Sequence, residues 1–129
     1  MTRSRRSARQ AGSAFERKIA DYFAHSLNDD RIDRRPKTGA RDRGDIGGVR
    51  IHGQRAVIEC KDTARTNLSV WIKEAHVEAN NDDALVGFVI HKRHGVSGPG
   101  HQWVTMTVDD LLALITGQRH GHCAEDFTE

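Results

Sequence analysis

Two charged residues interrupt an otherwise apolar stretch near the middle of the chain. The stretch Val57-Ile-Glu-Cys-Lys61 has the pattern of a buried strand, yet Glu59 and Lys61 carry opposite charges. Burying an ion is costly unless it is paired or bound to a ligand. Side chains two residues apart on a strand point to the same face, so Glu59 and Lys61 project together while Ile58 and Cys60 face the other way. The spacing predicts a polar site on one face and an inward-packed Cys60 on the other.

A third charged residue, Asp45, opens the preceding predicted strand. The pattern predicts strands over roughly residues 45–51 and 55–61, joined by a tight turn at His52-Gly53-Gln54. Such a turn folds the two strands antiparallel, which brings Asp45 and Glu59 to the same end of the hairpin.

These residue types suit metal-dependent chemistry. The carboxylates of Asp45 and Glu59, together with the Cys60 backbone carbonyl, would form an all-oxygen site suited to Mg²⁺, with Mn²⁺ as a substitute. Lys61 beside them could hold an attacking water and neutralise charge on a phosphate. The pattern therefore indicates hydrolysis of phosphodiesters.

Two purely structural interpretations remain open for these residues. Glu59 and Lys61 could form an exposed ion pair on a solvated strand face, which contributes at most about 1 kcal/mol. Glu16 lies in a predicted helix, where Ser13-Ala-Phe-Glu16 fits a capping box. Glu16 also lies at the edge of the apolar stripe of that helix, so it could face the site as well.

Hydrophobic periodicity predicts three helices and five strands in the order α-β-β-β-α-β-β-α, an α/β fold with a small mixed sheet flanked by helices. We expect one domain at about residues 12–117, between a flexible Arg-rich arm at 1–11 and a flexible tail at 118–129. The helices cover roughly residues 12–27, 67–82 and 109–117, the last ended by Gly117, and the strands roughly residues 31–36, 45–51, 55–61, 84–91 and 102–108.

The net charge of +2 hides an uneven distribution. The first ten residues hold four arginines and no acid, and residues 31–43 hold six basic residues against two acidic ones. Such clusters are typical of proteins that bind a phosphate backbone, although a solvated surface without a partner has the same composition.

The sequence excludes several classes of protein and site. No apolar run approaches the ~18 residues of a membrane span, so we expect no membrane association. The start of the chain is charged where a signal peptide is apolar, although its Arg/Ser-rich composition also fits an organelle transit peptide. The two cysteines, Cys60 and Cys123, form no disulfide framework, which fits a reducing cytoplasm.

Other conspicuous residues have simpler explanations. The pairs His91/His94 and His120/His122 lack the four ligands of a closed zinc site, so we interpret them as histidines of surface loops. Trp71 and Trp103 are interpreted as anchors of the core or of an interface rather than as platforms for base stacking. The segment Gly95-Val-Ser-Gly-Pro-Gly100 matches no phosphate-binding loop and is interpreted as a connection.

Several stretches in order resemble one nuclease superfamily. GSAFERKIADYFA, RRPKTGARDRGDI, VIECK and the helix with Trp71 are similar to the PD-(D/E)xK nucleases, and most of all to archaeal-type Holliday-junction resolvases. GFVIHKRHG and QWVTMTVDDLLALI resemble the phage-encoded versions. The resemblance runs from about residue 12 to about residue 116 and implies a restriction-endonuclease-like fold. It would place the protein in the cytoplasm, that of the host cell if a phage encodes it.

The resemblance also implies roles for individual residues. Asp45 and Glu59 match the metal-binding carboxylates of the family, and Lys61 matches its catalytic lysine. Glu16 matches a helix glutamate that supports the metal site, and Thr38 is the nearest match to a hydroxyl residue near the scissile phosphate. One departure is Gly44, which stands where the family name has proline.

The resulting hypothesis is a Mg²⁺-dependent endodeoxyribonuclease that resolves four-way DNA junctions by paired nicks. Two matched cuts imply a homodimer, for which the apolar residues of the helix at 67–82 and Trp71 are candidates. Phosphate contacts are expected from Arg5, Arg6, Arg34, Arg35, Lys37, Arg41 and Arg43. The alternatives are the same chemistry on another DNA substrate, as in a DNA-end exonuclease or a restriction-type enzyme, and a DNA-binding module without catalysis.

Overall fold

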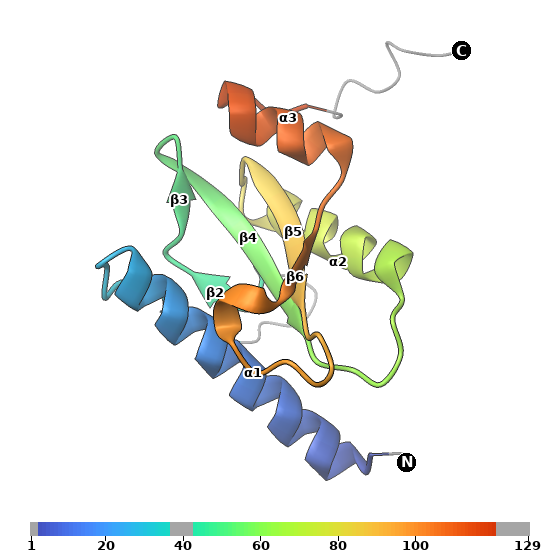
Figure 1. The fold of residues 1–129 in the computed structure, drawn as a ribbon. Helices are drawn as coiled ribbons and strands as arrows, with labels where there is room; N and C mark the ends of the chain where they lie inside the picture. The colour runs from blue at the N-terminus through green and yellow to red at the C-terminus, as the bar shows by residue number, and fades with distance from the viewer. Residues whose placement is uncertain (1–2, 37–42, 121–129) are drawn as a thin grey trace.

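A computed structural model describes residues 3–36 and 43–120. The fold is mixed α/β, with a mixed sheet of six strands and three α-helices around it (Figure 1). In chain order the elements are α1 (Arg5–Ser26), β1 (Asp33–Arg34), β2 (Ile46–Gly47), β3 (Arg50–Ile51), β4 (Gln54–Lys61), α2 (Leu68–Asn81), β5 (Val86–His91), the 3₁₀ turn η2 (Pro99–His101), β6 (Trp103–Thr105) and α3 (Val108–Thr116).

The sheet is built around the long strand β4. Its strand order is β1-β2-β4-β5-β6, and β3 pairs with β4 outside this path. Strands β4 and β5 are parallel, whereas β2 and β3 pair with β4, and β6 with β5, in the antiparallel sense. The parallel connection contains α2, as expected for a crossover between parallel strands.

The strand predicted at residues 45–51 is divided into β2 and β3. The break falls at Gly48, which has φ of +90°, a conformation that few residues other than glycine adopt. A Cβ at Gly48 would lie 2.6 Å from the Arg31 carbonyl oxygen, so the close passage of that chain also requires glycine. The predicted tight turn is confirmed, since His52 and Gly53 both have positive φ and Ile51 pairs with Gln54.

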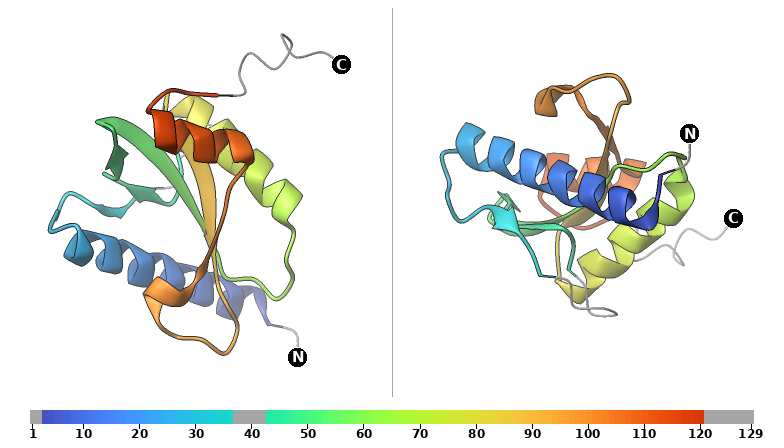
Figure 2. Two further views of the ribbon diagram at one scale, coloured as in Figure 1. Left: turned by 45° about the horizontal axis from the view of Figure 1, so that its top comes forward. Right: turned by 90° about the horizontal axis from the view of Figure 1, so that it is seen from below.

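Helices α1 and α2 cover opposite faces of the sheet (Figure 2). Ile58 and Cys60 lie in the main core with residues of α1, which confirms the inward packing of Cys60. Val57, on the alternate face of β4, packs instead with Ala79 of α2. The alternation predicted for β4 therefore separates two cores, one under each helix.

Helix α1 begins earlier than its apolar pattern predicted. It starts at Arg5, where Ser4 caps it by accepting a hydrogen bond of 3.1 Å from the Ser7 backbone N–H. Residues 5–11 are therefore helical rather than a separate arm, and residues 118–120 are the described part of the expected tail. Because Ser13 lies inside the helix, the predicted capping box at Ser13–Glu16 is wrong.

Helix α3 lies against the tip of the β3–β4 hairpin. It ends at Gly117, whose φ of +76° gives the predicted left-handed cap. Gln54 Nε2 donates to the Gly117 carbonyl at 2.7 Å, and His52 Nε2 lies 2.7 Å from the Leu114 carbonyl. No helix in the described ranges 3–36 and 43–120 is long and apolar enough to cross a membrane.

Helix α2 packs closely against β5 at a glycine. A Cβ at Gly87 would lie 2.5 Å from the Ala75 carbonyl oxygen, which belongs to the backbone of α2. Gly12 in α1 is the opposite case, because nothing lies within 4 Å of a Cβ built there.

The same substitution should therefore have opposite effects at these two glycines. Gly87→Ala forces α2 away from the sheet and should lower the free energy of unfolding by about 1–3 kcal/mol. Gly12→Ala adds a better helix former in open space and should raise it by up to about 1 kcal/mol. Urea unfolding of both variants measures this, and equal stability of Gly87→Ala and the wild type would contradict the close packing of α2.

Candidate functional site

Asp45 lies beside the carboxyl end of β4 and is 2% exposed. The pairing of Ile46 with Ile58 sets the register, and the Asp45 backbone N–H donates to the Ile58 carbonyl at 2.9 Å. Its carboxylate Oδ2 then accepts a hydrogen bond of 2.8 Å from the Cys60 backbone N–H. The Asp45 side chain thus takes the position of a strand partner for Cys60, which holds the carboxylate next to Glu59.

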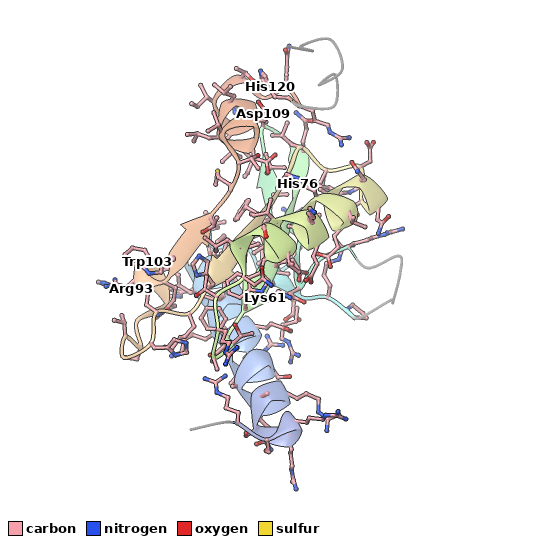
Figure 3. All side chains as sticks on the ribbon, turned by 90° about the vertical axis from the view of Figure 1, so that its right-hand side faces the viewer. Lys61, His76, Arg93, Trp103, Asp109 and His120 are labelled. Carbon is pink, nitrogen blue, oxygen red and sulfur yellow. The ribbon has the colours of Figure 1, made fainter. Side chains whose placement is uncertain are left out.

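Glu59 and Lys61 project from β4 toward the side of the sheet that α2 covers. Glu59 is 4% exposed, so the alternative of a solvated ion pair is wrong. Lys61 Nζ lies 3.8 Å from Glu59 Oε2 and donates to Glu74 Oε2 of α2 at 3.0 Å. Figure 3 shows Lys61 near the middle of the molecule, whereas Asp109 and His120 lie at the end formed by α3. The Asp45 carboxylate thus binds the backbone between Glu59 and Lys61, while Lys61 contacts Glu59 and, as an addition, Glu74.

Glu16 occupies a different position from the one expected. It is buried in α1, the helix that covers the other face of the sheet. Its Oε1 accepts a hydrogen bond of 3.2 Å from Arg34 Nε, so Glu16 orients an arginine of β1. Within residues 3–36 and 43–120, no three His, Cys, Asp or Glu side chains form a group that could hold a metal, so Glu16 does not complete such a cluster with Asp45 and Glu59.

Asp82 fixes the two described ends of the basic segment that precedes Asp45. This aspartate follows α2 and is 4% exposed. Arg35 Nη1 donates to Asp82 Oδ2 at 2.9 Å and to the Arg43 carbonyl at 3.1 Å. Arg43 Nε lies 3.9 Å from Asp82 Oδ1. The two arginines are therefore held together at the edge of the sheet.

The remaining predicted DNA contacts divide into two groups. Arg5 and Arg6 are exposed in the first turn of α1. Lys37 and Arg41 lie outside the described residues, as does Thr38, the candidate hydroxyl residue of the active site.

His91, at the end of β5, is not the surface-loop histidine that the sequence suggested. It pairs across the sheet with Lys61 and Trp103, and its Nε2 lies 2.7 Å from Thr105 Oγ1. Its ring centroid is 5.4 Å from that of Trp71. Burial lowers the pKa of His91 below its ordinary value.

The two tryptophans have different surroundings. Trp71 is 7% exposed and packs with Ala75 and Val89 in the core, so it is no surface for a partner chain. Trp103 on β6 is 54% exposed, and the Arg93 guanidinium lies 4.1 Å from its ring centroid (Figure 3). Trp103 is thus a surface aromatic beside a cation, rather than part of the core.

Sequence reasoning missed Glu74 and Asp82. Both reach their partners across many residues of chain, and neither has a motif of its own around it. For Glu74, the amphipathic pattern of α2 could have indicated a polar residue facing the edge of the sheet. Tertiary packing alone reveals these contacts.

The chain was compared with protein-family models, with curated proteins and with solved structures. None of them matches it.

The burial of His91 predicts a pH-dependent contribution to stability. A folded-state pKa below the usual value of 6.5 means that the unfolded chain binds more protons as the pH falls through that value. The stabilisation is therefore complete above about pH 6.5 and declines as the pH drops toward the lowered pKa. His91→Gln removes the titrating ring, so the stability of the wild type relative to this variant should fall as the pH is lowered below about 6.5.

Urea unfolding of both proteins at several pH values measures this difference. His94→Gln, at a histidine in the neighbouring loop, is the control. If the free energies of unfolding of the wild type and of His91→Gln change in parallel with pH, His91 does not contribute to the pH dependence of stability.

Proposed function

We propose that this protein is a metal-dependent endodeoxyribonuclease of restriction-endonuclease-like fold that cleaves branched DNA, with a four-way junction as its substrate. The observation that carries the proposal is at the carboxyl end of β4, where the Asp45 carboxylate binds the Cys60 N–H and Lys61 lies beside Glu59. Two of these side chains are nearly inaccessible to solvent, at 2% and 4% exposure. Buried charges of this kind are expensive and are typical of functional sites.

The donor set fits a hard divalent cation. Mg²⁺ is commonly bound by one or two carboxylates with water completing its shell, and Asp45 and Glu59 supply two carboxylates from neighbouring strands. The Cys60 carbonyl belongs to the residue whose N–H already binds Asp45. When bound, the cation would stabilise charge on the attacking and leaving oxygens of the phosphodiester.

The chain's own residues position the reactants. Lys61 Nζ, beside Glu59 and held by Glu74, can donate hydrogen bonds to an attacking water or to a phosphate oxygen. Glu16 acts through Arg34, which it orients on β1. In this role Glu16 positions an arginine of β1 for phosphate contact and does not bind the divalent cation.

The basic segment before Asp45 supports a nucleic-acid substrate. Asp82 anchors Arg35 and Arg43 at the sheet edge next to the site. Trp103 with Arg93 adds an exposed aromatic and a cation near the end of β5. Phosphate contacts of this kind fix the position of DNA without reading its sequence, which suits an enzyme that recognises branch shape.

Cleavage of a labelled four-way junction in Mg²⁺ tests this proposal. The wild type should make paired nicks in the junction and leave a matched linear duplex intact. Asp45→Ala and Lys61→Met should each reduce the cleavage rate by at least about 10²-fold while junction binding persists. Lys73→Met, at an exposed lysine of α2, is the matched control and should cleave normally.

Other outcomes would change the assignment. Equal cutting of linear duplex would keep the nuclease and discard junction selectivity. Tight junction binding without cleavage in Mg²⁺ or Mn²⁺ would instead identify a DNA-binding module, in which Glu59 and Lys61 are an inactive pair.

Paired nicks require two sites, and α3 offers an apolar surface for a second copy of the chain. Val108, Leu111, Leu112 and Ile115 follow the spacing of one helix face and are all exposed. Trp71 is buried and drops out of the interface expected on α2, which keeps fewer exposed apolar residues than α3, so we propose this stripe as the interface instead.

The interface on α3 predicts the behaviour of a charged variant. Wild-type protein should sediment as a dimer at micromolar concentration, and Ile115→Asp should shift it to monomer without loss of fold. Val77→Asp, at an exposed apolar residue of α2, should leave the dimer intact. A wild type that is monomeric with and without junction DNA would contradict the dimer.

A further inference from the structure

A hollow of about 320 Å³ lies between β1, the β3–β4 hairpin and the end of α2. Its lining includes two aspartates, Asp33 and Asp82, and no aromatic residue among those described. We call it the arginine hollow, because five arginines line it: Arg31, Arg34, Arg35, Arg50 and Arg55.

Two of these arginines lie opposite one another, and neither forms an ion pair with a described carboxylate. Arg50 and Arg55 are directly paired across the hairpin, an arrangement that is unfavourable for like charges. Arg55 Nη1 donates to the backbone carbonyl of Asp82 at 3.0 Å, a neutral acceptor. The Arg50 side chain makes no hydrogen bond or ion pair with any residue of 3–36 or 43–120. A bound anion would relieve this repulsion.

The hollow exists because its base lacks side chains. A Cβ at Gly47 would lie 2.8 Å from both Cγ and Cδ of Arg35, so glycine allows Arg35 to cross β2 and reach Asp82. Gly48 allows the Arg31 backbone to approach in the same way. The glycine pair therefore gathers arginines from β1, β3 and β4 around one opening.

The arginine hollow lies on the same side of β4 as the candidate active site. Alternation along the strand gives Arg55 the same face as Glu59 and Lys61. Glu59 lies four positions after Arg55 on the strand, a distance of about 13 Å at ~3.3 Å per residue. One strand of a duplex carries a phosphate about every 3.4 Å along its axis, so the two places lie within about four nucleotides of each other.

We propose that the arginine hollow binds a backbone phosphate of the DNA strand that is cut at Asp45, Glu59 and Lys61. Guanidinium groups match phosphate oxygens in pairs, and the absence of aromatic lining favours backbone over base contacts. The proposal rests on the proposed function for the identity of its ligand. It adds Arg50 and Arg55 to the DNA-binding surface and assigns them to positioning rather than to chemistry.

Salt-dependent binding without a divalent metal tests the arginine hollow separately from cleavage. The protein is titrated with labelled four-way junction in EDTA over a range of salt concentrations. Arg50→Gln should weaken binding about tenfold and lower the slope of log affinity against log salt by about 1. Arg119→Gln, which removes the same charge at a residue paired with Asp83, should leave the slope unchanged.

A charge reversal provides a second readout. Arg50→Glu should weaken DNA binding further, yet its thermal midpoint should equal or exceed that of the wild type because the like-charge pair is gone. Loss of affinity together with loss of fold in both Arg50 variants would mean a structural role and would overturn the proposal.

Three further results are informative. Unchanged affinity and slope in Arg50→Gln and Arg50→Glu would overturn the arginine hollow as a DNA contact. Inorganic phosphate could instead raise the thermal midpoint of the wild type while both variants bind DNA normally. That result would identify free phosphate as the ligand and would also overturn the proposal of a DNA contact. Full cleavage by Asp45→Ala would refute the proposed active site alone, since the binding measurement needs no catalysis.

Discussion

The hydrogen bond from the Cys60 backbone N–H to the Asp45 carboxylate is the constraint on which the site depends. Strand β2 is only two residues long, so it cannot supply a backbone acceptor along the whole of β4. Where the backbone pairing ends, the Asp45 carboxylate accepts the hydrogen bond of the Cys60 N–H instead. This geometry satisfies a buried N–H, and it brings a second carboxylate to Glu59 at the place where Lys61 emerges from the sheet.

Helix α2 connects the two ends of the functional surface. At its middle, Glu74 holds Lys61, and just beyond its end, Asp82 holds Arg35, which in turn binds the backbone carbonyl of Arg43. Gly87 lets the helix lie close to β5, so both contacts depend on one tight packing surface. A shift of α2 would therefore disturb Lys61 at the end of β4 together with Arg35 and Arg43, which lie in the segments between β1 and β2.

The errors of the sequence analysis have identifiable causes. The apolar stripe of α1 begins only where the helix packs against the sheet, so hydrophobic periodicity did not reveal its first turns. Those turns are capped by Ser4 and carry exposed arginines. The segment 45–51 was predicted as one strand, but Gly48 within it has a positive φ and divides it. The resemblance gave no hint that Glu16 contacts Arg34, because that contact comes from the packing of α1 against β1.

Local patterns in the sequence were enough to predict the alternation of β4, the tight turn at Gly53, the end of α3 at Gly117 and the position of Asp45 beside the end of β4. Each follows from local rules of strand geometry and backbone conformation, which act over a few residues. Three features come from the tertiary arrangement: Glu74 and Asp82 hold basic residues, His91 is half-buried against Trp71, and Arg50 and Arg55 line a hollow with β1. These are contacts between distant segments, and they depend on how helices cross the sheet, which short-range patterns do not specify.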